Sequence, residues 1–326
     1  MEYRDYPYQS ALAPYIRDYI AEKRALGFLY NGKAYQMYRF DQYWFSEGFN
    51  DVYITFEKVS KWVCAFPNES KSSQEERVNA VRSLAIYLIL HGIQCDVPLT
   101  KVGKDHPVIH LLDCTELHQF FEAADSYAPH SINLADYRMA DEYPIMFRLC
   151  YCCGMRNGEV CSLKTTDVDF EKGIIAIRGG KNQKDRLIYM PDDLRVLISA
   201  YYTALKACLG FDSVWLFPGR NPDNHIPNTS IDRKFREFWN KTDSSTHCDR
   251  TPTPHSLRHG FVVNRLNSWI LSGVDVNVMF IYLSRYLGHN DPDESFYYYH
   301  LVNDAYRILR QKDTISADVI PEVRRR

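Results

Sequence analysis

The pattern of apolar and polar positions predicts a helical first part of the chain. Four segments combine helical spacing of apolar side chains with a Gly or Pro within a few residues of their ends, where helices stop. These segments are residues 12–26, 35–45, 55–64 and 73–90. No segment here alternates strictly between apolar and polar residues, as a half-buried strand would. We therefore expect a small all-helical domain.

A polar stretch rich in helix breakers follows over residues 92–111. It combines Pro and Gly with Lys101 and Lys104, a composition typical of an interdomain linker. At about 150 residues per domain, a chain of 326 residues accommodates two domains. We place the boundary near residue 105, which gives a helical domain of residues 1–105 and a second domain of residues 106–326.

The second part is predicted to be mainly helical with one small β-hairpin. Residues 115–124 and 143–153 are predicted helices, and Thr253 is a suitable N-cap for a helix that begins at a proline. Two short runs rich in β-branched residues, 173–178 and 186–190, flank a Gly-rich basic turn. The expected fold class is mainly α with a small β-hairpin or sheet.

Composition argues against a membrane-spanning or disulfide-stapled chain. The sequence is 45% hydrophobic, and its longest uninterrupted apolar run, residues 84–90, is far shorter than the ~18 residues of a membrane span. The polar N-terminus carries charges of both signs, so we expect no signal peptide. Cys150, Cys152 and Cys153 crowd one apolar segment, as buried thiols do. We therefore expect a reducing, cytoplasmic location.

The overall charge does not indicate a nucleic-acid partner. The formal net charge is −2, and residues 106–326 carry 26 Lys and Arg against 28 Asp and Glu, whereas nucleic-acid-binding domains are often basic. Residues 171–190 are locally basic, with five Lys and Arg against two Asp and Glu. Any DNA-binding surface must therefore be local. The candidate DNA-binding residues are Lys101, Lys104, Lys184, Arg186, Arg233, Lys234 and Arg236.

Four local motifs carry side chains suited to phosphate chemistry. In chain order they are Gly154-Met155-Arg156 with Glu159, Lys181 in the hairpin turn, His255 and Arg258 in Pro254-His255-Ser256-Leu257-Arg258-His259, and Gly288-His289 with Tyr298 nine residues after the histidine. Each motif alone also fits a structural role: a surface ion pair, a solvated lysine, a surface His–Arg pair or a packed tyrosine. Their combination is what indicates chemistry.

Together these residue types match one reaction. Arg makes forked, charge-assisted hydrogen bonds to phosphate oxygens, and fixed donors of this kind stabilise a phosphoryl transition state. A Tyr becomes a nucleophile once the site removes its proton. The sequence has neither an Asp/Glu cluster spaced for Mg²⁺ nor a Gly-rich nucleotide loop. The chemistry indicated is phosphoryl transfer through a covalent phosphotyrosine, without metal or cofactor.

The order Arg, Lys, His-x-x-Arg, His, Tyr resembles the active-site order of the tyrosine recombinases, also called phage-type integrases. The resemblance implies a helical core-type DNA-binding domain and a catalytic domain that form a C-shaped clamp on double-stranded DNA. It also implies four protomers acting on two DNA sites, with the segment after Tyr298 docking on a neighbour. Whether DNA-bending accessory proteins take part stays open.

The resemblance also implies the roles of the residues that would bind the phosphate. Arg156 and Arg258 would clamp the scissile phosphate, and His289 would donate to its non-bridging oxygen. Glu159 would orient the site as a supporting residue.

The resemblance assigns the proton transfers to two further residues. Lys181 would protonate the departing 5′ oxygen, and His255 would assist proton movement at the nucleophile. Tyr298 would attack and leave a 3′-phosphotyrosine bond and a free 5′ hydroxyl. The alternatives that spacing leaves open are Tyr297 and Tyr299 for the nucleophile and Lys184 for the acid.

The expected function is a site-specific DNA recombinase or integrase, acting in integration or excision of a mobile element. A type IB topoisomerase-like enzyme is similar in its phosphotyrosine chemistry, but the helical domain ahead of the catalytic part favours the recombinase. A catalytically silent DNA-binding accessory protein is the alternative from another class, and the presence of all six catalytic side chains argues against it.

Overall fold

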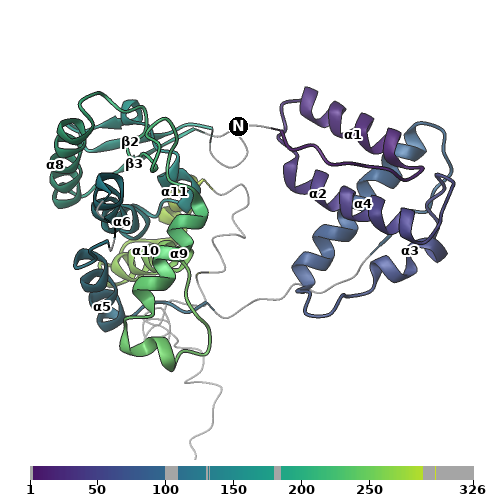
Figure 1. Cartoon of the computed structure of the whole chain (residues 1–326). Helices are drawn as coiled ribbons and strands as arrows, with labels where there is room; N and C mark the ends of the chain where they lie inside the picture. The colour runs from purple at the N-terminus through teal and green to yellow at the C-terminus, as the bar shows by residue number, and fades with distance from the viewer. Residues whose placement is uncertain are drawn as a thin grey trace, which may run out of the picture. The chain divides into compact units, whose positions relative to one another are not determined.

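The computed structural model describes residues 3–99, 109–129, 131, 133–179, 185–288 and 298. The chain divides into two compact units, residues 1–107 and 108–326. Each unit has a hydrophobic core of its own. The fold is mainly helical with one small sheet, as predicted (Figure 1). In the part of the chain that the structure describes, every helix is too short or too polar to cross a bilayer.

The described residues of the first unit form four helices, and all four were predicted. They are α1 (Ala13–Ala25), α2 (Asn31–Ser46), α3 (Phe56–Val63) and α4 (Lys71–Leu90). α4 packs against the other three, and Phe40 and Trp44 of α2 are fully buried between them. This apolar interior explains why short helices with modest caps form here, since packing rather than propensity supplies most of their stability.

The second unit places helices around a small antiparallel sheet. The helices among its described residues are α5 (Cys114–Asp125), α6 (Leu134–Cys153), α7 (Asn157–Cys161), α8 (Asp192–Leu209), α9 (Asn228–Trp239), α10 (Pro254–Leu271) and α11 (Val276–Leu287). Short 3₁₀ segments lie at Thr165–Asp167 and Asp243–Thr246. In Figure 1 the sheet and α8 lie at one end of this unit and α5 at the other.

The sheet contains the predicted hairpin and one additional strand. Its order is β1 (Val168–Asp169), β2 (Ile174–Ile177) and β3 (Arg186–Tyr189), with Ile175 opposite Ile188. The predicted strands are β2 and β3. β1 was not predicted, because a two-residue strand is too short to show alternation.

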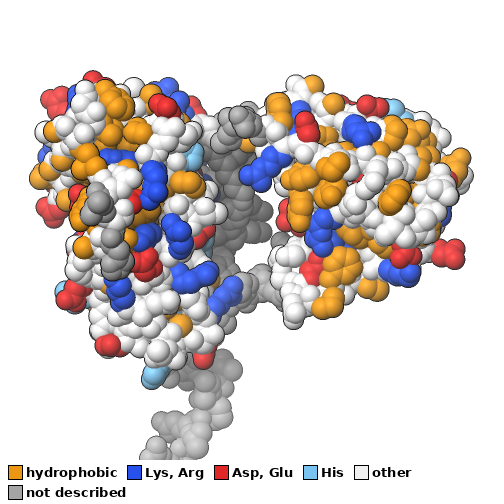
Figure 2. Space-filling view, viewed as in Figure 1, with side chains coloured by type: hydrophobic (Ala, Val, Ile, Leu, Met, Phe, Trp, Pro, Cys, Tyr) orange, Lys and Arg blue, Asp and Glu red, His pale blue; other side chains and the backbone are white. Residues whose placement is uncertain are grey.

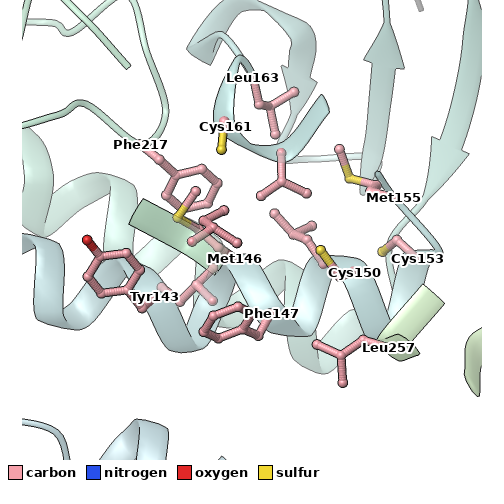
Figure 3. Packing of buried hydrophobic residues seen from close by; sticks show 14 of the residues in the cluster. Tyr143, Met146, Phe147, Cys150, Cys153, Met155, Cys161, Leu163, Phe217 and Leu257 are labelled. Atoms are coloured by element: carbon pink, nitrogen blue, oxygen red, sulfur yellow. The ribbon is translucent and has the colours of Figure 1, made fainter. Parts of the chain in front are cut away.

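The core of the second unit lies along α6, against which α10 and other elements pack. Figure 3 shows side chains of this cluster, among them Met146, Phe147, Cys150, Cys153, Met155, Leu163, Phe217 and Leu257. All nine cysteines of the chain are free, and Cys150 and Cys153 are fully buried. Burial raises the pKa of both thiols, so they act as small apolar side chains, as predicted.

α6 begins at Leu134, well before the predicted start at residue 143. Its first half has a polar sequence, but two of its charged residues form a buried ion pair, Arg138 with Glu142 one turn later. Arg138 also donates to the carbonyl oxygens of Pro218 (2.7 Å) and Gly219 (2.6 Å). The prediction was too short because it required apolar side chains on the buried face, whereas paired charges fill that position.

We predict that Arg138→Met lowers the free energy of unfolding by about 3–5 kcal/mol, because it leaves the buried Glu142 side chain and the carbonyl oxygens of Pro218 and Gly219 without their donor. Arg148 on the same helix pairs with Asp125 at the surface, so Arg148→Met is the matched control, with an expected loss of about 0–1 kcal/mol. Urea denaturation measures both. Equal losses of unfolding free energy in the two variants would show that the buried pair contributes no more to stability than the surface pair.

Candidate active site

The first arginine motif lies at the turn between α6 and α7. Gly154 caps α6 in the left-handed region, with φ +63°. A Cβ at this position would lie 2.5 Å from Cδ1 of Phe261, so both the backbone conformation and the space require glycine. The turn places Arg156 at the N-cap of α7.

The carboxylate of Glu159 holds two arginines. Arg156 donates from Nη1 to Oε1 (3.0 Å), and its backbone nitrogen donates to Oε2 (2.9 Å). Arg186 of β3 forms a forked pair with the same carboxylate, from Nη1 to Oε1 (2.9 Å) and from Nη2 to Oε2 (2.6 Å). Burial by itself would raise the pKa of Glu159, but the hydrogen bond and charge of Arg186 and the charge of Arg156 outweigh it, and the pKa is lowered. The carboxylate therefore stays ionised.

Arg186 does not occupy the position expected of a DNA contact. Its side chain is 8% exposed, and besides Glu159 it donates from Nε to the carbonyl oxygen of Tyr286 (2.8 Å). Alternation along β3 explains the burial, since side chains two apart in a strand share a face and Ile188 on that face is in the core. The predicted role of Arg186 in DNA binding is corrected: it supports Glu159 from inside the domain.

Carbonyl oxygens at the ends of two helices accept the other hydrogen bonds that the arginines donate. Arg258 of α10 donates from Nη1 to the oxygen of Gly154 (2.5 Å) and from Nη2 to that of Leu287 (2.8 Å). Arg156 donates from Nη2 to the oxygen of Gly288 (3.2 Å). These acceptors lie at the C-terminal ends of α6 and α11. Such ends have carbonyls without intrahelical partners and a partial negative charge, which suits guanidinium groups.

The cluster carries more positive than negative charge. Among its described residues, three guanidinium groups (Arg156, Arg186 and Arg258) surround the single carboxylate of Glu159. Arg258 is 1% exposed, and its pKa is lowered to about 10, first by burial and then by the positive charge of Arg156. It still carries its charge at neutral pH. Because excess buried charge is costly, the cluster is suited to an anion such as a phosphate diester.

The predicted nucleophile lies beside this cluster. Tyr298 is 3% exposed and packs with apolar residues of α10 and α11. It is among the groups whose charge affects the pKa of Arg258. Its hydroxyl oxygen lies 2.7 Å from Nδ1 of His259 on α10. The structure thus places Arg156, Glu159, Arg258 and Tyr298 together.

Two histidines follow one another on the exposed side of α10. His255 is exposed, and its ring centroid lies 4.5 Å from that of His259, with the ring planes nearly perpendicular. His259 was present in the motif but was given no role in the prediction. The four-residue spacing between the two histidines could have indicated it, because side chains four apart share a helix face.

Seven candidate residues lie outside the described residues. They are Lys101, Lys104, Lys181, Lys184 and His289, together with Tyr297 and Tyr299, the two alternatives for the nucleophile.

The basic residues predicted on the surface lie on α9. Arg233 and Arg236 are exposed, whereas Lys234 is 12% exposed and donates to Oε2 of Glu237 (2.8 Å). Arg233 and Lys234 line a groove of about 580 Å³ together with Arg220. Figure 2 shows Lys and Arg side chains gathered on the face of the second unit that carries α9. Local positive charge is therefore present, although the chain is not basic overall.

Comparison with known proteins relates this arrangement to one family. Residues 111–304 match the Phage integrase family. The putative integrase/recombinase y4rE of Sinorhizobium fredii (strain NBRC 101917 / NGR234) is 25% identical over 289 residues, which cover 87% of this chain and 89% of that protein. Tyrosine recombinase XerD of Neisseria meningitidis serogroup B (strain ATCC BAA-335 / MC58) is 27% identical over 243 residues, 72% of this chain and 74% of that protein.

A solved structure shares the fold. The Tn1549 transposon integrase, determined in complex with transposon right end DNA, superimposes with a TM-score of 0.64 over 91% of this chain and 99% of that chain. The sequence identity is 14%, so this likeness concerns the fold.

We predict that Gly154→Ala destabilises the second unit by roughly 2 kcal/mol or more, through left-handed backbone strain and overlap with the Phe261 ring. Gly210, which caps α8 at φ +74° with open space around it, provides the matched control. Gly210→Ala retains only the backbone strain, about 1 kcal/mol. Urea denaturation of both variants checks this, and equal losses would contradict the close packing at Gly154.

Proposed function

Because the chain belongs to the phage integrase family, we propose that it is a site-specific DNA recombinase that cleaves and rejoins strands through a 3′-phosphotyrosine intermediate. One observation carries this proposal: the excess positive charge of three arginines around Glu159 lies next to the buried Tyr298. The positive charge suits an anionic phosphate, and the tyrosine hydroxyl can serve as the nucleophile that attacks it. We place the reaction in integration or excision of a mobile element.

The proposed cleavage step uses the residues in the roles expected from the sequence. Arg156 and Arg258 neutralise the non-bridging oxygens of the scissile phosphate as charge develops on them. Because the carbonyls of helix ends and the Glu159 carboxylate already hold these guanidinium groups, little reorganisation accompanies binding. Tyr298 Oη forms the bond to phosphorus, and the bond to the 5′ oxygen breaks.

The remaining proposed roles belong to residues near the reacting bonds. His289 donates to a non-bridging oxygen, and Lys181 gives a proton to the leaving 5′ oxygen. His255, on the exposed side of α10, assists proton movement. The phosphotyrosine bond keeps the energy of the broken diester, so we propose that rejoining needs neither a nucleotide cofactor nor a metal ion.

DNA binding is proposed for local basic surfaces. Arg233 and Arg236 of α9 are exposed, and Arg233 lines the groove that Arg220 also lines. Phosphate neutralisation by such side chains provides sequence-independent affinity. We propose that the first unit contacts the same duplex, with Lys101 and Lys104 of the predicted linker adding phosphate contacts.

Assembly on DNA as a tetramer is proposed from the apolar surface of the second unit. Val278, Ile281 and Tyr282 of α11 are each more than half exposed. A groove of about 520 Å³ beside them is lined by apolar side chains that include Trp269 and Met279. Exposed apolar patches of this kind mark interaction sites, and we propose that a neighbouring protomer covers this one.

We predict that the wild-type protein forms a covalent adduct with DNA that persists in EDTA and denaturant. The substrates are duplexes that carry the sequences flanking the gene, nicked so that the 5′-hydroxyl strand diffuses away after cleavage. Tyr298→Phe abolishes the adduct because the nucleophilic oxygen is removed.

Tyr297→Phe and Tyr299→Phe are the matched controls for that experiment, and both retain the adduct. Loss of the adduct in a neighbour but not in Tyr298→Phe would contradict the proposed nucleophile. Binding to a verified site without any adduct would instead indicate a silent DNA-binding protein.

We predict different defects for a buried and an exposed arginine. Arg186→Ala slows adduct formation by about 10²-fold, because Glu159 loses its forked partner and Arg156 is misplaced, yet it leaves the salt dependence of DNA binding unchanged. Arg236→Ala weakens binding and lowers the slope of log affinity against log salt by about 1. Gel-shift titrations across salt concentrations measure the slopes. A lower slope for Arg186→Ala would restore it as a phosphate contact.

A further inference from the structure

The environment of the Tyr298 hydroxyl raises the question of which group takes its proton, since the proposed roles give His255 only an assisting part. A tyrosine has a pKa of about 10, so the group attacks phosphorus efficiently only if its proton is taken away. Tyr298 is 3% exposed and is packed among apolar side chains of α10 and α11. Bulk water is therefore poorly placed to receive the proton, and a protein group must do so.

The geometry points to His259 as the group that accepts this proton. Its Nδ1 lies 2.7 Å from Oη of Tyr298, a normal distance for a hydrogen bond and within the reach required of a general base. The two rings lie with centroids 5.4 Å apart. A neutral imidazole accepts a hydrogen bond at one nitrogen, and His is the side chain that most often serves as a general base.

The positions of the two histidines on α10 support this assignment. His259 is half-buried beside Tyr298, whereas His255, one turn earlier, is exposed. The ring of His255 meets that of His259 nearly at a right angle, with centroids 4.5 Å apart. His259 therefore contacts the reacting oxygen directly, and His255 contacts the ring of His259 from the exposed side.

In the cleavage step, each proton that leaves one group is taken up by another. As Oη of Tyr298 bonds to phosphorus, its proton passes to Nδ1 of His259. The bond from phosphorus to the 5′ oxygen breaks, and that oxygen takes a proton from the acid proposed to be Lys181. On rejoining, the 5′ hydroxyl attacks phosphorus and gives its proton back to the group that supplied it, proposed to be Lys181, while the bond from phosphorus to Oη breaks and His259 returns its proton to the departing tyrosine. The inference rests on the proposed function, since it assigns a residue to the same step.

The test separates proton transfer at the nucleophile from proton transfer at the leaving group. Nicked duplexes are prepared with either the normal 5′ oxygen or a bridging 5′ sulfur at the cleavage position. A thiolate leaves without a proton because its conjugate acid has a pKa of about 8.5. The sulfur substrate therefore removes the need for a general acid but not the need for a base.

Two substitutions at one position separate basicity from hydrogen bonding. His259→Asn keeps a hydrogen-bonding group near the position of Nδ1 but cannot take up a proton, and His259→Ala removes the group. Asn264→Ala is the matched control, because Asn264 also lies on α10 and donates to a tyrosine hydroxyl, that of Tyr151 at 3.0 Å, away from the site. Unfolding temperature and gel-shift affinity confirm that each variant is folded and binds DNA.

We expect His259→Asn to slow adduct formation by about 10²–10⁴-fold on the oxygen substrate, and by a similar factor on the sulfur substrate. Imidazole in the buffer should partly restore His259→Ala, and Lys181→Ala should recover on the sulfur substrate alone. Asn264→Ala should match the wild type on both.

Three results would count against the inference or its premise. A wild-type rate for His259→Asn would show that His259 does not accept the proton and at most positions Tyr298 by hydrogen bonding. Recovery of His259→Asn on the sulfur substrate would place its action at the leaving group. No adduct from the wild type on either substrate would instead overturn the proposed function.

Discussion

The second unit depends on how Glu159 neutralises and fixes its arginines. One carboxylate accepts a forked pair from Arg186 and a further bond from Arg156, while Arg258 is charged and nearly fully buried beside them. Such a cluster is tolerable without ligand only because every guanidinium meets a carboxylate or a carbonyl. It still holds more positive than negative charge, and that imbalance makes the site suited to a phosphate.

Two helix ends complete this arrangement. Gly154 ends α6 and Gly288 ends α11, both in the left-handed region, and their terminal carbonyls accept hydrogen bonds from Arg258 and Arg156. Both glycines are also close-packed, since a Cβ would meet Phe261 at Gly154 and Arg186 at Gly288. The two glycine turns that end the helices thus also supply the carbonyl oxygens that bind the arginines. The same turns therefore determine both the fold and the site.

The sequence was sufficient to predict the secondary-structure elements that depend on local pattern. The helices of the first unit, the hairpin of β2 and β3 and the start of α10 at Pro254 all followed from periodicity, breakers and caps. The first half of α6 was missed because Arg138 and Glu142 are buried as a pair, which a pattern of single residues does not reveal. Arg186 was taken for a surface residue for a similar reason, since its partner Glu159 is far away in sequence. The contact between His259 and Tyr298 joins residues 39 positions apart and needed the fold.

The central claim is that arginine charge in this cluster stabilises the phosphate during cleavage. It is tested most directly by replacing one non-bridging oxygen of the scissile phosphate with a methyl group, which leaves the linkage uncharged. Arg156 is one-fifth exposed, so Arg156→Ala is the suitable variant. The account predicts that this change slows adduct formation by about 10²–10³-fold on the normal phosphate and far less on the uncharged linkage. An equal loss on both substrates would contradict it.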